Sequence, residues 1–194
     1  MHYPHHPLKG LTDFITTFHP LSQKDVNALL EICRVVSYKK NTDVQPIGHT
    51  CRTIYFIKKG CLRVYYLKGD QDVTESLEFE NAFVARIESL ISGTPSRKGI
   101  QAVEDTTLIA INADKLKMLY DKHLEIERLF KNIFLRTFIA TLNRMEGMQF
   151  HSAEVRYANF LKEYPTALKR VPLKYIASYL GITQVSLSRI RAKH

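Results

Sequence analysis

Residues 34–112 form a series of short segments rich in β-branched and aromatic side chains, with no helical pattern between them. This region constrains the fold more than any other feature of the chain. Turns such as Pro46–Gly48 and Gly69–Asp70 separate the segments. The segments are RVVSYKK (34–40), RTIYFIKK (52–59), CLRVYYLK (61–68), DVTESLEF (72–79) and TTLIAIN (106–112). Closely spaced strands without intervening helices predict an antiparallel sandwich or jelly-roll barrel.

Helical periodicity flanks this region. Residues 21–32 predict a short amphipathic helix, 114–121 another, and 123–148 a long one. Two apolar rows run along the long helix: Ile126, Phe130, Phe134, Phe138 and Leu142 in one, and Leu129, Ile133 and Ala140 in the other. A helix within one small domain needs only one such row. We therefore expect one row to pack on the barrel and the other on the same helix of a second copy; the alternative is a helix buried wholly in its own chain.

The last segment has the pattern of a helix-turn-helix. Ser152 is placed to cap an earlier helix that stops before Pro165, and two short helices follow at 173–180 and 184–191. Between these two, Gly181 allows the positive φ that a tight turn requires, and Thr183 can cap the second helix. A small residue, Ala177, permits close helix crossing. The expected core positions are all apolar: Ile176, Leu180, Ile182, Leu187 and Ile190.

Positive charge is concentrated in the same part of the chain. The formal net charge is +9, from 28 Lys and Arg against 19 Asp and Glu. From Tyr164 onward there are six basic residues and no acidic one. A basic block without acidic partners attracts polyanions, and nucleic acid is the commonest of these in cells. A solvated basic tail is the alternative interpretation.

The second helix of the motif carries side chains suited to a DNA major groove. Val185 falls outside the apolar core positions, so we expect it to face outward, as a contact to a thymine methyl group or as a tolerated surface valine. Gln184 matches adenine edges and Arg189 matches guanine. Phosphate contacts would set the register. The candidate DNA-binding set is Arg170, Lys174, Thr183, Gln184, Val185, Ser186, Ser188, Arg189 and Arg191.

Barrel, long helix and helix-turn-helix in this order resemble the Crp/Fnr family of bacterial transcription regulators. The specific segments are IYFIKKGCLRVYY (54–66) and VPLKYIASYLGITQVSLSRIR (171–191), the latter similar to the short C-terminal motif of Bacteroidetes members. The resemblance implies an α+β fold: a cyclic-nucleotide-binding-like jelly-roll sensor domain with an N-terminal helix (1–115), a dimerisation helix region (116–149) and a winged-helix-like DNA-binding domain (150–194). It also implies a homodimer on near-palindromic double-stranded DNA, with RNA polymerase as a further partner. Relatives commonly carry Arg-Glu where this chain has Gln184-Val185, so we expect a different target sequence.

The sensor half departs from the family pattern. Members that bind a cyclic nucleotide use a Gly-Glu pair at the ribose, and an Arg followed by Ser or Thr at the phosphate. Within FVARIESLISGTPSRKGIQA (83–102), Glu88 and Arg97 stand near these places, but Ile87 precedes the glutamate and Lys98 follows the arginine. We therefore do not expect cAMP. A different small anionic effector held by Arg97, or no ligand, both remain open, and no cofactor is predicted.

Other protein classes lack their signatures. A cupin-type metalloenzyme needs clustered histidines on its strands, and His49 is the one histidine between residues 34 and 112. The sequence has no G-x-S-x-G, P-loop, H-E-x-x-H or C-x-x-C motif, so we expect neither an enzyme nor a metal site. The lack of a long apolar run and of a secretory signal predicts a cytoplasmic protein with no membrane contact. A ligand-binding barrel that acts through a protein partner is the alternative function.

Overall fold

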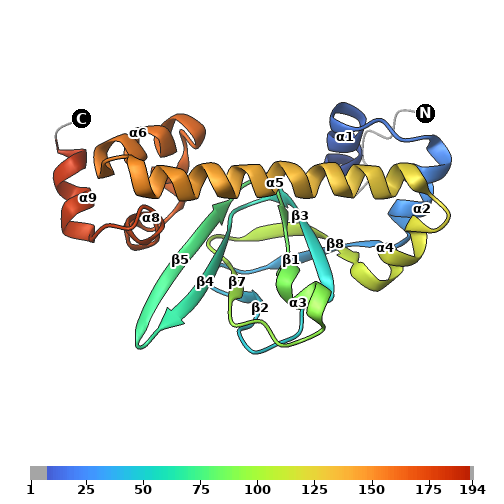
Figure 1. Cartoon of the computed structure of the whole chain (residues 1–194), viewed down its shortest axis with the longest axis horizontal. Coiled ribbons are helices and arrows are strands. Elements are labelled where there is room, and N and C mark those ends of the chain that lie inside the picture. Colours follow the sequence, from blue (N-terminus) through green and yellow to red (C-terminus); the bar gives the residue numbers. More distant parts are fainter. Residues whose placement is uncertain (1–7, 193–194) are drawn as a thin grey trace.

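The computed structural model describes residues 8–192. Strands form a barrel beneath one long helix, with the N-terminal helices at one end of that helix and the C-terminal helices at the other (Figure 1). In chain order the elements are α1 (Lys9–Phe18), α2 (Gln23–Glu31), β1 (Cys33–Tyr38), β2 (Asp43–Gln45), β3 (Thr53–Lys59), β4 (Leu62–Lys68), β5 (Gln71–Glu78), β6 (Phe83–Val84), α3 (Ile87–Ser92), β7 (Gly99–Ala102), β8 (Thr106–Asn112), α4 (Ala113–Tyr120), α5 (Leu124–Phe150), α6 (Ala153–Glu163), α7 (Ala167–Arg170), α8 (Leu173–Tyr179) and α9 (Gln184–Arg191).

The barrel consists of two four-stranded sheets, in the orders β1-β8-β3-β6 and β2-β7-β4-β5. The recorded pairings among residues 8–192 are antiparallel, with Cys33 opposite Ile111 and Leu62 opposite Glu78. Alternate side chains point inward and close the barrel core: Val44, Tyr55, Ile57, Leu62, Val64, Val84, Ile100, Ala102, Leu108 and Ala110. The predicted antiparallel jelly-roll architecture and the α+β fold class are confirmed.

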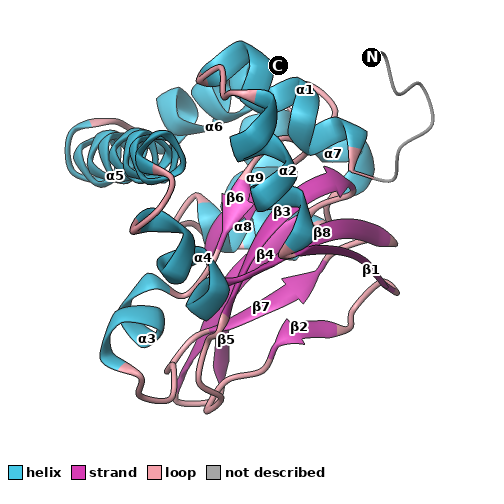
Figure 2. Ribbon diagram, turned by 90° about the vertical axis from the view of Figure 1, so that its right-hand side faces the viewer, coloured by secondary structure: helices cyan, strands magenta, loops and turns pink. Residues whose placement is uncertain are grey.

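A second core joins the N-terminal helices and the start of α5 to the sheet β1-β8-β3-β6. Its buried members include Leu11, Ile15, Leu29, Phe56 and Ile126. Figure 2 shows α5 nearly end-on, beside the strands. Helices α1, α3 and α7 and the short strands β2, β6 and β7 were not predicted from the sequence. Two to four residues carry no measurable alternation, and these strands are extended because neighbouring strands supply their hydrogen bonds.

Burial along α5 differs from the prediction that one apolar row packs on the barrel and the other on a second copy. Ile126 and Phe130 are buried, whereas Phe134, Phe138 and Leu142 of the same row are 48%, 49% and 40% exposed. The change therefore occurs along the length of the helix and not between its two faces. Only the first part of α5 lies on the barrel and N-terminal helices, and the rest runs on towards the C-terminal helices (Figure 1).

Helices α6 and α9 have the bounds that the sequence indicates, and α8 ends one residue before its predicted end, at Tyr179. The Ser152 side chain accepts a hydrogen bond from the Val155 amide at the start of α6, and α6 ends at Glu163, before Pro165. Thr183 caps α9 by accepting from the Ser186 amide. Both predicted caps are confirmed.

Candidate nucleic-acid interface

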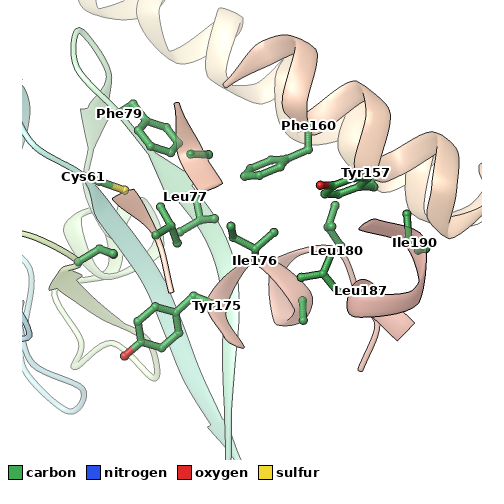
Figure 3. Packing of buried hydrophobic residues seen from close by; sticks show 14 residues of the cluster. Cys61, Leu77, Phe79, Tyr157, Phe160, Tyr175, Ile176, Leu180, Leu187 and Ile190 are labelled. Atoms are coloured by element: carbon green, nitrogen blue, oxygen red, sulfur yellow. The ribbon is translucent and has the colours of Figure 1, made fainter. Parts of the chain in front are cut away.

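Helices α8 and α9 form a helix-turn-helix with its own apolar core. Ile176, Leu180, Leu187 and Ile190 are buried, as predicted, and pack below α6 together with Ala177 (Figure 3). The fifth predicted core residue, Ile182, is half-buried against the same cluster. Gly181 between the helices has φ +68°, the left-handed conformation that the turn was expected to need. The local pattern therefore predicted this motif in the correct register.

The outward face of α9 is free of the rest of the protein. Val185 is 61% exposed, and Gln184, Ser188, Arg189 and Arg191 are also exposed. No acidic side chain occurs in this helix. The face therefore combines one apolar contact, hydrogen-bonding groups and two guanidinium groups, which is the chemistry that base edges and phosphates require.

Two hydroxyl groups at the start of α9 have a structural task. The Thr183 Oγ1 lies 3.1 Å from the Ser186 amide nitrogen that it caps and 3.0 Å from the Ser186 hydroxyl oxygen. Both oxygens stand at the positive end of the helix, where an anion is favoured. Lys174 on α8 is exposed, with its Nζ 4.9 Å from the ring centroid of Tyr175.

Arg170 does not present a free guanidinium group, which differs from its expected place among the phosphate contacts. Its Nη2 lies 2.6 Å from a carboxylate oxygen of Glu80 and 2.6 Å from one of Glu104. The hydrogen bonds that it donates to Glu80, and also those to Glu104, raise the pKa of Arg170. Both acids lie in the barrel half of the chain, so Arg170 connects the C-terminal helices to the barrel.

The barrel and the C-terminal helices also share an apolar core next to Arg170. Cys61, Leu77, Phe79 and Val103 of the barrel half are buried with Tyr157, Phe160, Tyr175, Ile176 and the other core residues of the C-terminal helices (Figure 3). The Thr74 amide of β5 also donates to the Ser178 hydroxyl of α8 at 2.8 Å. Helix α8 therefore packs on β5, while the outward face of α9 remains exposed.

Arg63 at this contact was not singled out by the sequence. Its side chain on β4 is only 2% exposed and donates to both carboxylate oxygens of Asp72, at 2.5 and 2.6 Å, and to Gln101 at 2.9 Å. The guanidinium group also stacks 3.9 Å from the ring centroid of Tyr175 on α8. A buried arginine on an alternating strand gives no local sign of a partner more than 100 residues away.

Of the two predicted effector residues, Glu88 is held by other side chains, whereas Arg97 is exposed. Glu88 accepts hydrogen bonds from Arg86 at 2.8 Å and from the buried Ser96 hydroxyl at 3.2 Å. Arg86 also faces Glu75 at 3.6 Å, and Lys98 pairs with the same carboxylate. Arg97 is exposed and takes part in no ion pair recorded within residues 8–192.

Two further properties hold for the described part of the chain. No helix there is long and apolar enough to cross a membrane. Residues 8–192 also contain no group of three or more His, Cys, Asp or Glu side chains placed to hold a metal ion.

Comparison with known proteins identifies the architecture. Residues 35–123 match the family model of the cyclic nucleotide-binding domain. Similar solved structures include FixK2 from Bradyrhizobium japonicum, with 19% identity, a TM-score of 0.72 and 84% of each chain covered. The c-di-GMP-responsive global regulator CLP from Xanthomonas campestris has 16% identity and a TM-score of 0.69, over 89% of this chain and 91% of CLP. A transcriptional regulator of the crp/fnr family from Eubacterium rectale has 20% identity and a TM-score of 0.69, over 92% of this chain and 85% of that chain.

No curated protein matches the sequence. The similar structures extend over barrel, long helix and C-terminal helices together, so the predicted resemblance is confirmed at the level of the fold. Residues 35–123 are thus similar to the cyclic nucleotide-binding domain, and the chain as a whole has the fold seen in the Crp/Fnr regulators.

Proposed function

We propose that the protein is a homodimeric, sequence-specific DNA-binding transcription regulator of the Crp/Fnr type. The observation that carries this proposal is the outward face of α9, which is exposed, has no acidic side chain and is held by a buried helix-turn-helix core. In this proposal α9 enters the major groove, as the second helix of such motifs does. We also propose the domain division 1–115, 116–149 and 150–194, and a cytoplasmic location where the chromosome is accessible.

The proposed contacts fall into two groups. Gln184, Val185 and Arg189 meet base edges, because they occupy the exposed first turns of α9. The residues proposed for phosphate contacts are Lys174, Thr183, Ser186, Ser188 and Arg191. Arg170 is left out of this set because Glu80 and Glu104 occupy its guanidinium group.

The exposed part of α5 supports the dimer. Its uncovered apolar side chains are Phe134, Leu135, Phe138, Ile139, Leu142 and Met145. The rings of Phe134 and Phe138 stack with centroids 6.3 Å apart, so these two side chains share one apolar surface. Burying such a surface against the same helix of a second copy is strongly favourable. A two-fold axis along α5 would present two α9 helices to half-sites about one DNA turn (~34 Å) apart.

For the sensor domain we propose that cAMP is not the effector. A small anion at the loop between α3 and β7 has to compete with Glu88 for Arg86 and Ser96, while Arg97 stands free beside them. A barrel without a ligand is the other proposal. RNA polymerase is a partner proposed from the family resemblance alone.

Selection of bound sequences from a random DNA library tests the function. We expect enrichment of a near-palindrome with two equal half-sites. In the same assay, Arg189→Ala is expected to cost about 1–3 kcal/mol on the selected site and to relax one base position. Arg52→Ala is the matched control, because this exposed arginine lies in the barrel half. Failure to enrich any sequence at low salt would reject the proposal in favour of a protein partner.

A further inference from the structure

The C-terminal end of α8 is held by arginines from two other helices. The Arg144 Nη2 on α5 donates to the Tyr179 carbonyl oxygen at 2.8 Å, and its guanidinium carbon lies 4.4 Å from the Tyr179 ring centroid. The Arg156 Nε on α6 donates to the Leu180 carbonyl oxygen at 3.1 Å. The last carbonyl groups of a helix have no partner within it and carry partial negative charge, so guanidinium groups stabilise them well.

A packing contact adds to these hydrogen bonds. A Cβ atom on Gly181 would lie 2.5 Å from the Met148 Cε of α5. The turn of the helix-turn-helix therefore lies directly against the Met148 side chain in the last turns of α5, and the positive φ of Gly181 is what favours glycine there. Arg144 and Met148 are four residues apart, so they project from one face of α5 onto the same turn.

Helix α5 also carries the exposed apolar side chains proposed to pair with a second copy. The helix runs without interruption through 27 residues, from Leu124 to Phe150, so Phe138 and Leu142 lie within two turns of Arg144. Only His151 and Ser152 separate α5 from α6. Two backbone residues alone leave rotational freedom between the helices, whereas a tie to α8 removes it.

We propose that Arg144 is a positioning residue that fixes the distance and angle between the two α9 helices of the DNA-bound dimer, by tying each helix-turn-helix to the helix that pairs with the second copy. This inference rests on the proposed function. Arg144 touches no DNA in this scheme. It acts through Tyr179 and the turn, so its effect is on the spacing of half-sites and not on the bases within them.

Substitutions of Arg144 can distinguish a positioning role from an effect of its positive charge alone. The Arg144 Nε is buried without a hydrogen-bond partner among the described residues. The observed pose is therefore defined by the carbonyl bond and the stack on Tyr179. A lysine keeps the charge and one donor but loses the planar stack. Arg144→Lys should accordingly retain part of the effect, and Arg144→Met should retain little.

The test measures the affinity of full-length protein for duplexes that carry two selected half-sites with the spacer changed by one or two base pairs. Each added base pair moves one half-site by about 3.4 Å and rotates it by about 35°, so the unchanged protein should prefer one spacing. Arg144→Met is expected to reduce the ratio of affinities for native and altered spacers by about 2- to 30-fold. Tyr179→Leu should act in the same direction.

Arg136→Met serves as the matched control, since this exposed arginine lies two turns earlier on α5. It should leave the spacing ratio unchanged. An equal loss of affinity on every spacer in Arg144→Met and Tyr179→Leu would show a merely structural role and overturn the inference. If Arg144→Met does not fold, an unchanged ratio in Arg144→Lys and Tyr179→Leu overturns it equally. Absence of DNA binding by the unchanged protein would instead refute the proposed function itself.

Discussion

Glu78 makes the stability of the protein depend on pH in a predictable direction. This residue ends β5, and burial raises its pKa from 4.5 to about 7, with a hydrogen bond from Ser76 opposing the change. The nearby Glu163 on α6 raises the pKa further and Arg144 on α5 lowers it. The carboxyl group thus lies where barrel, long helix and C-terminal helices meet.

The magnitude follows from the two pKa values. A difference of about 2.5 between the folded and unfolded states corresponds to about 3 kcal/mol. Because the folded state binds the proton more tightly, the cost is absent below about pH 4.5, grows as the pH rises to about 7, and is constant above that. Glu78→Gln removes the titrating group. The variant should therefore have a free energy of unfolding higher than the unchanged protein by up to about 3 kcal/mol at pH 8, with the gain vanishing near pH 4.5.

Urea unfolding at several pH values between 4.5 and 8 measures this difference. Protein concentration must be held constant, because an associating chain gains apparent stability by mass action. Glu31→Gln on the exposed side of α2 is the control and should leave the pH dependence unchanged. Parallel curves for Glu78→Gln and the unchanged protein would refute the reasoning, since they would mean that Glu78 does not titrate between these pH values.

Three further substitutions test the fold and the proposed dimer. Gly60→Ala should lower Tm, because φ +111° costs a non-glycine residue about 1–3 kcal/mol and the new Cβ would lie 2.8 Å from the Thr106 Cα. Gly69→Ala is the control: it also has positive φ but lies in open space, so its Tm should fall less. Arg170→Gln leaves Glu80 and Glu104 without their cation, so amide hydrogen exchange in residues 167–191 should be faster, with a cost of about 1–3 kcal/mol; Lys169→Gln is the control, and equal exchange in both variants would contradict the assigned connection. Phe138→Ser should raise the Kd of the proposed dimer by about 100-fold, as expected from about 3 kcal/mol of apolar burial lost over two copies. Sedimentation analysis measures this change, with the exposed Met118→Ser as the control. If Phe138→Ser has the same mass as the unchanged protein at low concentration, α5 pairing is rejected.

The helix-turn-helix could be predicted residue by residue because its signals are local. The capping Thr183, the turn at Gly181 and the apolar periodicity all lie within a few residues of one another. Strands β2, β6 and β7 are different, because their extended conformation depends on hydrogen bonds from strands far along the chain.

The difference between local and long-range signals also explains which residues of the candidate site could be predicted. Exposure of Val185 followed from its place outside the helical core pattern, and the structure agrees. The pairing of Arg170 with Glu80 and Glu104 joins residues 90 and 66 positions apart, so no local pattern could indicate it. Arg63 and Arg144 were missed for the same reason, since each acts on a residue of α8 that is distant in the sequence.

Arg63 has a consequence for how the two halves of the chain move. From its position on β4, the guanidinium group of Arg63 contacts β5 through Asp72, β7 through Gln101 and α8 through Tyr175, so the helix pair packs on this sheet. We therefore expect a displacement of these strands to be passed to α8 through Arg63 and Tyr175. Under the proposed function, a change deep in the barrel would in this way alter how α9 meets DNA without contacting α9 itself.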